Sequence, residues 1–263
     1  MNDSPSERLQ KSETTSTQDE PQTLIAHLSE LRYRLLMAAA GIAVFILVLL
    51  PFSSSVYELV SLPIRNLLPE GSSMIATEVA APFLAPIRLS IYIAVLLAMP
   101  WILYQLWAFI APALYRSEKI IGATLLPLSI LLFYAGIAFC WYLILPLLFS
   151  LFITAAPEGV TVMTDINSYL NFVLRFALTF GLAFQTPIVV IALITLGVVS
   201  AKRLAHMRPY IVIGCLVSGM LLTPPDVVSQ LVLAIPIWTL FELGLLLGRL
   251  LTYYRTRNQA TKT

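Results

Sequence analysis

Uncharged apolar runs, long enough to cross a lipid bilayer, constrain this chain more than any other feature of its sequence. The first run extends over 35–52 without a single charged residue. A helix needs about 20 apolar residues to cross about 30 Å of hydrocarbon. Of the 263 residues, 59% are hydrophobic and only 11% are charged. The sequence therefore predicts an all-α, polytopic membrane protein with six transmembrane helices.

The later runs differ in length and regularity. They cover 83–115, 120–152, 165–199, 210–222 and 227–247. The second span is expected to kink near Pro100, because proline removes a helical hydrogen bond. Asp165 or Ser168 is placed to cap the fourth helix. The fifth run covers only about 20 Å at 1.5 Å per residue, so the fifth and sixth spans are expected to be short.

The segments outside these runs divide the chain further. The stretch 53–82 is polar overall, but its apolar residues recur near helical spacing, which predicts a short amphipathic helix on the outer surface. Residues 1–22 are rich in Ser, Thr, Gln and Glu and are expected to form a disordered cytoplasmic tail. The six-span membrane domain then covers 23–250, and 251–263 forms a basic cytoplasmic tail.

The distribution of basic residues predicts the orientation of the spans. In a six-span arrangement, 13 of the 16 Lys and Arg residues fall on one side. Basic residues accumulate in cytoplasmic loops, so both termini are expected in the cytoplasm. The residues on this side are Arg8, Lys11, Arg32, Arg34, Arg116, Lys119, Lys202, Arg203, Arg208, Arg249, Arg255, Arg257 and Lys262.

The motifs of common enzyme classes are missing from the sequence. His27 and His206 are isolated, and there is no His-Glu-x-x-His pair, nucleophile elbow or phosphate-binding glycine loop. We therefore expect no enzyme activity, cofactor or metal. A net charge of +2 is too small to indicate nucleic-acid binding. Cys140 and Cys215 lie in apolar runs and are interpreted as small buried hydrophobes.

Two acidic residues on the cytoplasmic side are candidate binding groups. Glu30 lies four residues before Arg34, so both share one face of a helix that precedes the first span. Glu118 follows an aromatic segment in the next cytoplasmic loop. Together they suit a cationic, partly apolar ligand, because a carboxylate accepts two hydrogen bonds from a guanidinium. Alternatively, Glu30 only neutralises Arg34, and Glu118 only pairs with a neighbouring cation.

Polar residues inside the spans leave similar alternatives open. Gln185 lies near the middle of span four, where it either bonds a neighbouring span or docks a partner's helix. Arg175 is expected to extend to the outer headgroups. Glu242, in the inner half of span six, is expected to pair with Arg249 or to be solvated at the interface.

Several segments occur in the order found in one known family. The chain resembles the TatC family over roughly 21–253. The matching segments are His27-Leu-Ser-Glu30-Leu-Arg32, Met74-Ile-Ala-Thr-Glu78, Trp107-Ala-Phe109-Ile-Ala-Pro112-Ala-Leu-Tyr115, Ala156-Pro-Glu-Gly159, Arg208-Pro-Tyr210 and Gly219-Met-Leu-Leu-Thr-Pro-Pro-Asp226. This resemblance implies a six-span subunit of the twin-arginine translocase, which receives signal peptides of folded precursor proteins.

The resemblance also implies roles for individual residues. Glu30 and Glu118 look like the carboxylates that receive the arginine pair of the signal. The residues that match the rest of that surface are Arg32, Phe109 and Tyr115, and those that match sensitive extracytoplasmic positions are Pro63, Glu78 and Asp226. The family often has a glutamate where this chain has Gln185, which cannot titrate but can still dock a partner helix.

Partners follow from the resemblance as well. It implies single-span TatA-type and TatB-type subunits, export driven by the protonmotive force, and a homo-oligomer within a hetero-complex. It also implies the lipid bilayer of a bacterial inner membrane as the location. A small-solute secondary transporter is the alternative. That class predicts polar residues converging at the bilayer midplane, and they are sparse in this sequence.

Overall fold

The computed structural model describes residues 19–65, 79–110, 119–154, 165–222 and 227–260. Every element assigned in these residues is a helix, which confirms the all-α prediction for them. The principal elements are α2 (Asp19–Leu49), α3 (Ser53–Arg65), α4 (Ala81–Ile110), α5 (Lys119–Phe139), α6 (Leu145–Thr154), α7 (Ile166–Ala183), α8 (Thr186–Thr195), α9 (Ala201–His206), α10 (Arg208–Leu222) and α11 (Val227–Ala260).

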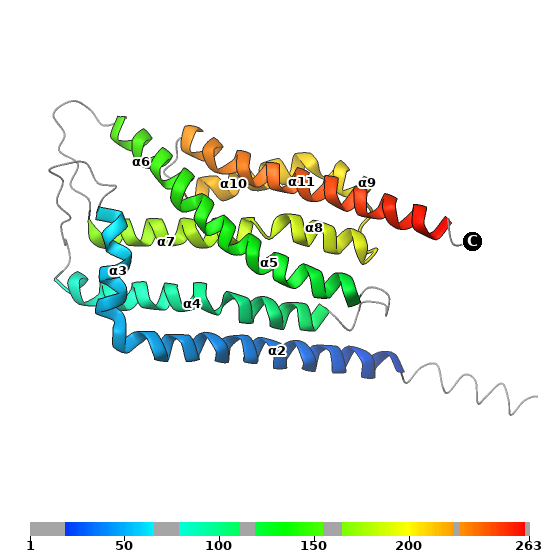
Figure 1. The fold of residues 1–263 in the computed structure, drawn as a ribbon, viewed down its shortest axis with the longest axis horizontal. Helices are drawn as coiled ribbons and strands as arrows, with labels where there is room; N and C mark the ends of the chain where they lie inside the picture. The colour runs from blue at the N-terminus through cyan, green and yellow to red at the C-terminus, as the bar shows by residue number, and fades with distance from the viewer. Residues whose placement is uncertain (1–18, 66–78, 111–118, 155–164, 223–226, 261–263) are drawn as a thin grey trace, which may run out of the picture.

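Long helices lie side by side in a bundle (Figure 1). Among the described residues, five helices are long and apolar enough to cross a membrane, and Arg208–Leu222 is a shorter apolar helix. These six correspond to the six predicted spans. α2 packs on α4, α5 packs on α7, and α11 packs on both α8 and α10. The pair α2 and α4 therefore forms one side of the bundle, and α10 and α11 lie on the other (Figure 1).

Figure 1 places the beginning of α2 and the end of α11 at the same end of the bundle. We call this the terminal end. The end of α4 and the helix α9 also lie toward it (Figure 1). At the opposite end, α2 passes through a 3-10 turn, Leu50–Phe52, into α3, which turns away from the bundle axis. α3 corresponds to the predicted short helix within 53–82 and packs on α4, and its position on the outer surface stays a prediction.

Prolines shape three of the spans in different ways. α4 continues as one helix through Pro100, where the sequence predicts a kink. The third span contains a π-helical turn, Cys140–Ile144, which ends two residues before Pro146. The fourth span is interrupted between α7 and α8, because Pro187 has no N–H to bond the carbonyl of Ala183 one turn earlier. Interruptions of this kind are typical of prolines inside spans.

The largest buried cluster joins spans two, three, four and six. Its fully buried members include Leu89, Ile144, Val173, Phe180 and Leu233. Glycines let the helices approach each other closely within the bundle, as small residues do in membrane helix packing. A methyl group added at Gly136 would lie 2.5 Å from the backbone oxygen of Phe180. The helices α5 and α7 thus meet nearly backbone to backbone. Cys140 and Cys215 are buried free cysteines, as predicted.

The cap of the fourth helix is also as predicted. Asp165 is the N-cap of α7, and its carboxylate accepts a hydrogen bond of 2.9 Å from the backbone N–H of Ser168. This bond satisfies one of the first-turn donors that have no partner within the helix. The local sequence therefore determines where the fourth span begins.

The predicted lengths of the last two spans are half right. α10 has only 15 residues, as expected, but α11 has 34 residues and is not short. Residues 251–260 contain no glycine or proline to end the helix, so α11 continues to Ala260, within the predicted basic tail. At the other terminus, α2 begins at Asp19, inside the predicted tail 1–22. Two acidic residues and a proline in its first turn favour that start.

Candidate functional site

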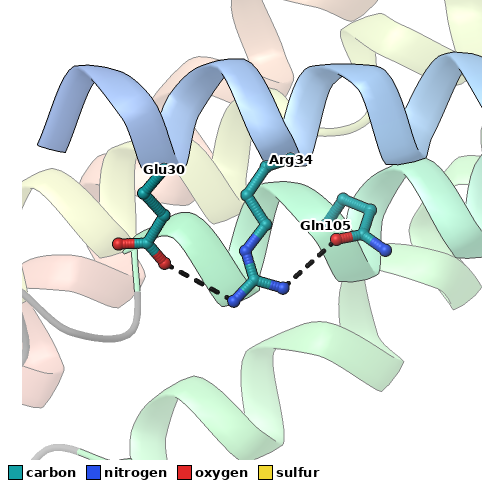
Figure 2. A network of polar contacts seen from close by, with 3 residues as sticks. All are labelled: Glu30, Arg34 and Gln105. Carbon is teal, nitrogen blue, oxygen red and sulfur yellow. Dashed lines mark hydrogen bonds and ion pairs between the residues drawn. The ribbon is translucent and has the colours of Figure 1, made fainter. Parts of the chain in front are cut away.

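A polar network lies between α2 and α4 toward the terminal end. The guanidinium of Arg34 donates to Oε1 of Glu30 at 3.4 Å and to Oε1 of Gln105 at 3.3 Å (Figure 2). Glu30 and Arg34 stand one turn apart on α2, as the i, i+4 spacing predicts. Gln105 comes from α4 and is only 4% exposed. The network therefore ties a surface ion pair to a buried amide on the neighbouring helix.

The geometry of this network leaves binding capacity on Glu30. The ion pair is a single contact near the upper limit of hydrogen-bond length, and its side chains are 27% exposed for Arg34 and 32% for Glu30. The second carboxylate oxygen of Glu30 points away from Arg34 (Figure 2). A carboxylate accepts up to about four hydrogen bonds, so Glu30 can take a second cation while keeping the first. Nε of Arg34 is buried and has no partner.

An aromatic contact extends the same interface between α2 and α4, which we call the seam, toward the terminal end. The rings of His27 and Phe109 stack with centroids 4.6 Å apart and planes 29° apart. Phe109 lies one turn beyond Gln105 on α4, and His27 lies one turn before Glu30 on α2. Arg32 is exposed and lies two residues from Glu30, which directs it to a different side of α2. The structure thus brings Glu30 and Phe109 to one seam and leaves Arg32 outside it.

Trp101 sets the position of the two helices along this seam. Its indole N–H donates to the backbone carbonyl of Met37 at 2.9 Å. The indole also lies against Gly41, where an added methyl group would come within 2.2 Å of the ring. A larger residue at Gly41 would push the helices apart. The close approach of α2 and α4 is what places Arg34 opposite Gln105.

Gln185 occupies the break between α7 and α8 and is half-buried. Its amide nitrogen donates to the backbone carbonyl of Ser129 on α5 at 2.8 Å. The hydroxyl of Ser129 accepts from the indole N–H of Trp107 at 3.1 Å, which links α4 to the same point. Of the two predicted roles of Gln185, bonding a neighbouring span is confirmed by this contact. Docking of a partner helix stays a prediction.

Glu242 has a different partner from the one predicted. It does not pair with Arg249 but forms a two-bond ion pair with Arg208, with both nitrogen–oxygen distances 2.7 Å. Arg208 begins α10, and packing of α10 on α11 brings it to Glu242. Arg208 and Glu242 lie 34 positions apart in the chain, so their pairing cannot be read from helical spacing.

Arg175 is exposed on α7, and its predicted reach to the outer headgroups stays a prediction.

Several predicted site residues lie outside the described residues. Tyr115, Glu118, Glu78 and Asp226 belong to this group. Pro63 lies in α3, but its side chain is also outside the description. Their predicted roles, and the meeting of Glu118 with Glu30, stay predictions. In the described part of the chain, no group of three or more His, Cys, Asp or Glu residues is placed to hold a metal ion.

Sequence reasoning missed two residues of these networks. Gln105 was passed over because an uncharged amide in an aromatic segment gives no signal of its own. Its spacing of four residues from Phe109 was the available clue, since that spacing puts both on one face of α4. Arg208 is predicted as a cytoplasmic charge and as part of a family-matching segment, but no local pattern links it to Glu242.

Comparisons with known proteins agree on one family. The family model described as "Sec-independent protein translocase protein (TatC)" matches residues 26–236. The chain is 50% identical over 233 residues to the Sec-independent protein translocase protein TatC of Azotobacter chroococcum, covering 89% of this chain and 91% of that protein. It is 48% identical over 231 residues to the protein of the same name from Escherichia coli K12, covering 88% and 90% of the two chains.

A solved structure gives the same result for the fold. The crystal structure described as the twin arginine translocase receptor TatC superposes with a TM-score of 0.77 at 35% identity. The match covers 86% of this chain and 99% of that one. The six-span architecture predicted from the apolar runs is therefore an architecture already seen in a solved structure. These findings favour the translocase interpretation over the small-solute transporter.

Proposed function

This chain belongs to the TatC family of Sec-independent protein translocase proteins, and from that premise we propose that it receives twin-arginine signal peptides at the terminal end of its bundle. The observation that carries the proposal is the Glu30 carboxylate. It already accepts one guanidinium, from Arg34, and one of its oxygens points away from that partner (Figure 2). A site that holds one guanidinium loosely is chemically suited to another.

The arginine pair of the signal would bind two carboxylates. One arginine meets the outward oxygen of Glu30, and the second meets Glu118. Charge-assisted hydrogen bonds contribute about 1.5–3 kcal/mol each, more than neutral ones. The arginine pair therefore contributes strongly to the binding free energy of the signal. Arginine presents a planar fork to a carboxylate, whereas lysine is a point charge, so the site discriminates between the two. Phe109 and Tyr115 shape the surrounding surface, and Arg32 acts from the neighbouring side of α2, outside the seam.

The apolar part of the signal has a surface beside the seam. Leu28, Leu31 and Leu35 are 63%, 43% and 68% exposed on α2, and Leu106 is 51% exposed on α4. Such side chains favour lipid or another apolar segment over water. We assign the apolar core of the signal to this surface, next to the polar seam that holds its arginines.

The remaining parts of the proposal concern topology and partners. The excess of basic residues on one side supports a cytoplasmic location of both termini. Family membership supports a bacterial inner membrane. TatA-type and TatB-type single-span subunits dock near Gln185, whose side chain already makes an interhelical hydrogen bond. Pro63, Glu78 and Asp226 act on the extracytoplasmic side. The chain works as a homo-oligomer within this hetero-complex, and the protonmotive force drives export.

Crosslinking tests the proposed receptor site. Single cysteines replace Glu30, Glu118 or Val48, and each variant is mixed with a precursor that carries a cysteine beside its arginine pair. Val48 is the matched control, since it is 58% exposed on α2 but far from the terminal end. The native Cys140 and Cys215 are buried and serve as the background measurement. We expect crosslinks at the first two positions and none at the third.

A precursor with two lysines in place of the arginines is the specificity control. Weaker labelling by this precursor at both acidic positions supports guanidinium recognition. Equal labelling by the two precursors, or preferred labelling at Val48, would overturn the proposed site. Export of a folded reporter in cells with and without the chain then separates a binding role from a role in transport.

A further inference from the structure

A second charged site lies on the opposite side of the bundle from the polar seam. A cleft of about 280 Å³ opens beside the ion pair between Arg208 and Glu242. The other residues that matter in its lining are Thr239, Leu243, Leu246 and Arg249. From its charge and its surroundings, we propose that this cleft binds the headgroup of an anionic phospholipid.

The charges in the cleft favour an anion. Both oxygens of Glu242 accept from Arg208, so this carboxylate is already neutralised by a paired guanidinium. Arg249 then leaves the lining with an excess of one positive charge. Glu242 and Arg249 are seven residues apart on α11, which puts them on the same face two turns from each other. An anion between the two guanidiniums meets a net positive field.

The ion pair also orients one donor group for a ligand. Arg208 uses Nε and one terminal nitrogen, NH2, to hold Glu242. The other terminal nitrogen, NH1, takes no part in that pair and keeps two N–H donors. A guanidinium held in a two-bond ion pair has a fixed plane, so these donors have a fixed direction. Phosphate oxygens are well suited to accept hydrogen bonds from these donors.

The surroundings favour a lipid over a soluble anion. Leu243 and Leu246 line the cleft and are 48% and 58% exposed. Tyr210 and Ile213, which follow Arg208 along α10, are 70% and 58% exposed. This surface belongs to spans that lie in the bilayer, so acyl chains are what such side chains meet. The cleft lies near the start of α10, just after the basic residues Lys202 and Arg203 of α9. Basic pockets between spans at headgroup depth are typical phospholipid sites.

Native mass spectrometry of the purified full chain tests this site. The protein is transferred from detergent with phosphatidylglycerol or with phosphatidylcholine, and the retained lipid molecules are counted. We expect retention of phosphatidylglycerol over phosphatidylcholine. Arg249→Gln should weaken that retention about fivefold, since one basic residue near a lipid surface contributes about 1 kcal/mol. Arg249→Lys keeps the charge and should retain most of the binding.

Arg175→Gln is the matched control, because it removes an exposed arginine from another span, α7. Equal loss in the Arg175 and Arg249 variants would mean a general charge effect and would overturn the site. Unchanged retention in Arg249→Gln, or equal retention of both lipids, would overturn it too. Displacement of the lipid by millimolar glycerol phosphate would assign the cleft to a soluble phosphate instead. Thermal unfolding of each variant is the control that shows whether Arg249→Gln retains the fold.

Discussion

Replacing Arg34 by Gln separates the two interpretations of Glu30. If Glu30 is a receptor for guanidinium groups, Arg34 competes electrostatically with the signal peptide, because its bond to one oxygen of Glu30 weakens the attraction of the carboxylate for a second cation. Removing the competitor then strengthens signal binding, while Glu30→Gln weakens it. If Glu30 only neutralises Arg34, both changes disturb the same internal pair and both weaken whatever depends on it. The two interpretations therefore predict opposite signs for Arg34→Gln.

The magnitude follows from the geometry of the pair. Arg34 and Glu30 are joined by one contact of 3.4 Å and are about a third exposed, so solvent screens their attraction. Exposed ion pairs contribute about 0.2–1 kcal/mol. Freeing Glu30 should thus tighten signal binding at most about fivefold. Loss of the carboxylate removes a charge-assisted hydrogen bond of about 1.5–3 kcal/mol, which weakens binding about 10-fold to 150-fold.

The assay is equilibrium binding of a fluorescent twin-arginine signal peptide to the chain in lipid nanodiscs, measured by anisotropy. The variants are Arg34→Gln, Glu30→Gln and the double variant. Arg203→Gln is the matched control, because it removes an exposed arginine that also lies toward the terminal end. A twin-lysine peptide measures the non-specific part. In the double variant, removal of Arg34 should give no gain, since its effect acts through Glu30.

The reasoning is refuted if Arg34→Gln weakens binding as much as Glu30→Gln does. It is also refuted if Arg203→Gln tightens binding as much as Arg34→Gln, because the gain would then come from net charge. Circular dichroism of each variant shows whether the helices are retained.

Three further predictions follow from the packing. Gly41→Ala should lower the free energy of unfolding by about 1–3 kcal/mol, because the new methyl group meets the Trp101 indole. Gly214→Ala is the control and should not lower it, because open space surrounds Gly214. Thermal unfolding compares the two variants. Gln185→Leu should lower the free energy of unfolding by about 0.6 kcal/mol, because its hydrogen bond to α5 is lost. It should also reduce copurification of single-span partners while signal binding persists. Unchanged copurification would remove Gln185 from the docking site. Asp165→Ala should destabilise α7 by about 1 kcal/mol, and Asp165→Asn, which keeps a capping oxygen, should not; hydrogen exchange at the first turn measures this.

Features set by local sequence could be predicted well. The apolar runs located the six spans, because hydrocarbon requires about 20 apolar residues in each helix. Asp165 as a cap and the amphipathic α3 also follow from spacing along one helix. The pair of Glu30 and Arg34 belongs to the same class, since one turn of α2 joins them.

Features set by packing between helices could not be predicted in this way. Gln105 meets Arg34 across 71 positions of the chain, and Arg208 meets Glu242 across 34. Which faces of two helices touch depends on close approaches such as that at Gly41, and no periodicity within one helix reports them. The length of α11 was missed for another reason. Its apolar run ends near 247, but the helix has no residue there that stops it.

The contact between Trp101 and the backbone of Met37 limits how α2 can move when a signal arrives. Sliding α2 along α4 by one turn would displace the two helices by 5.4 Å, break the indole hydrogen bond and drive other side chains into the ring. Swinging the terminal end of α2 outward keeps that contact as a pivot. We therefore expect a signal helix that enters this side of the bundle to tilt α2 about Trp101 rather than to slide it along α4.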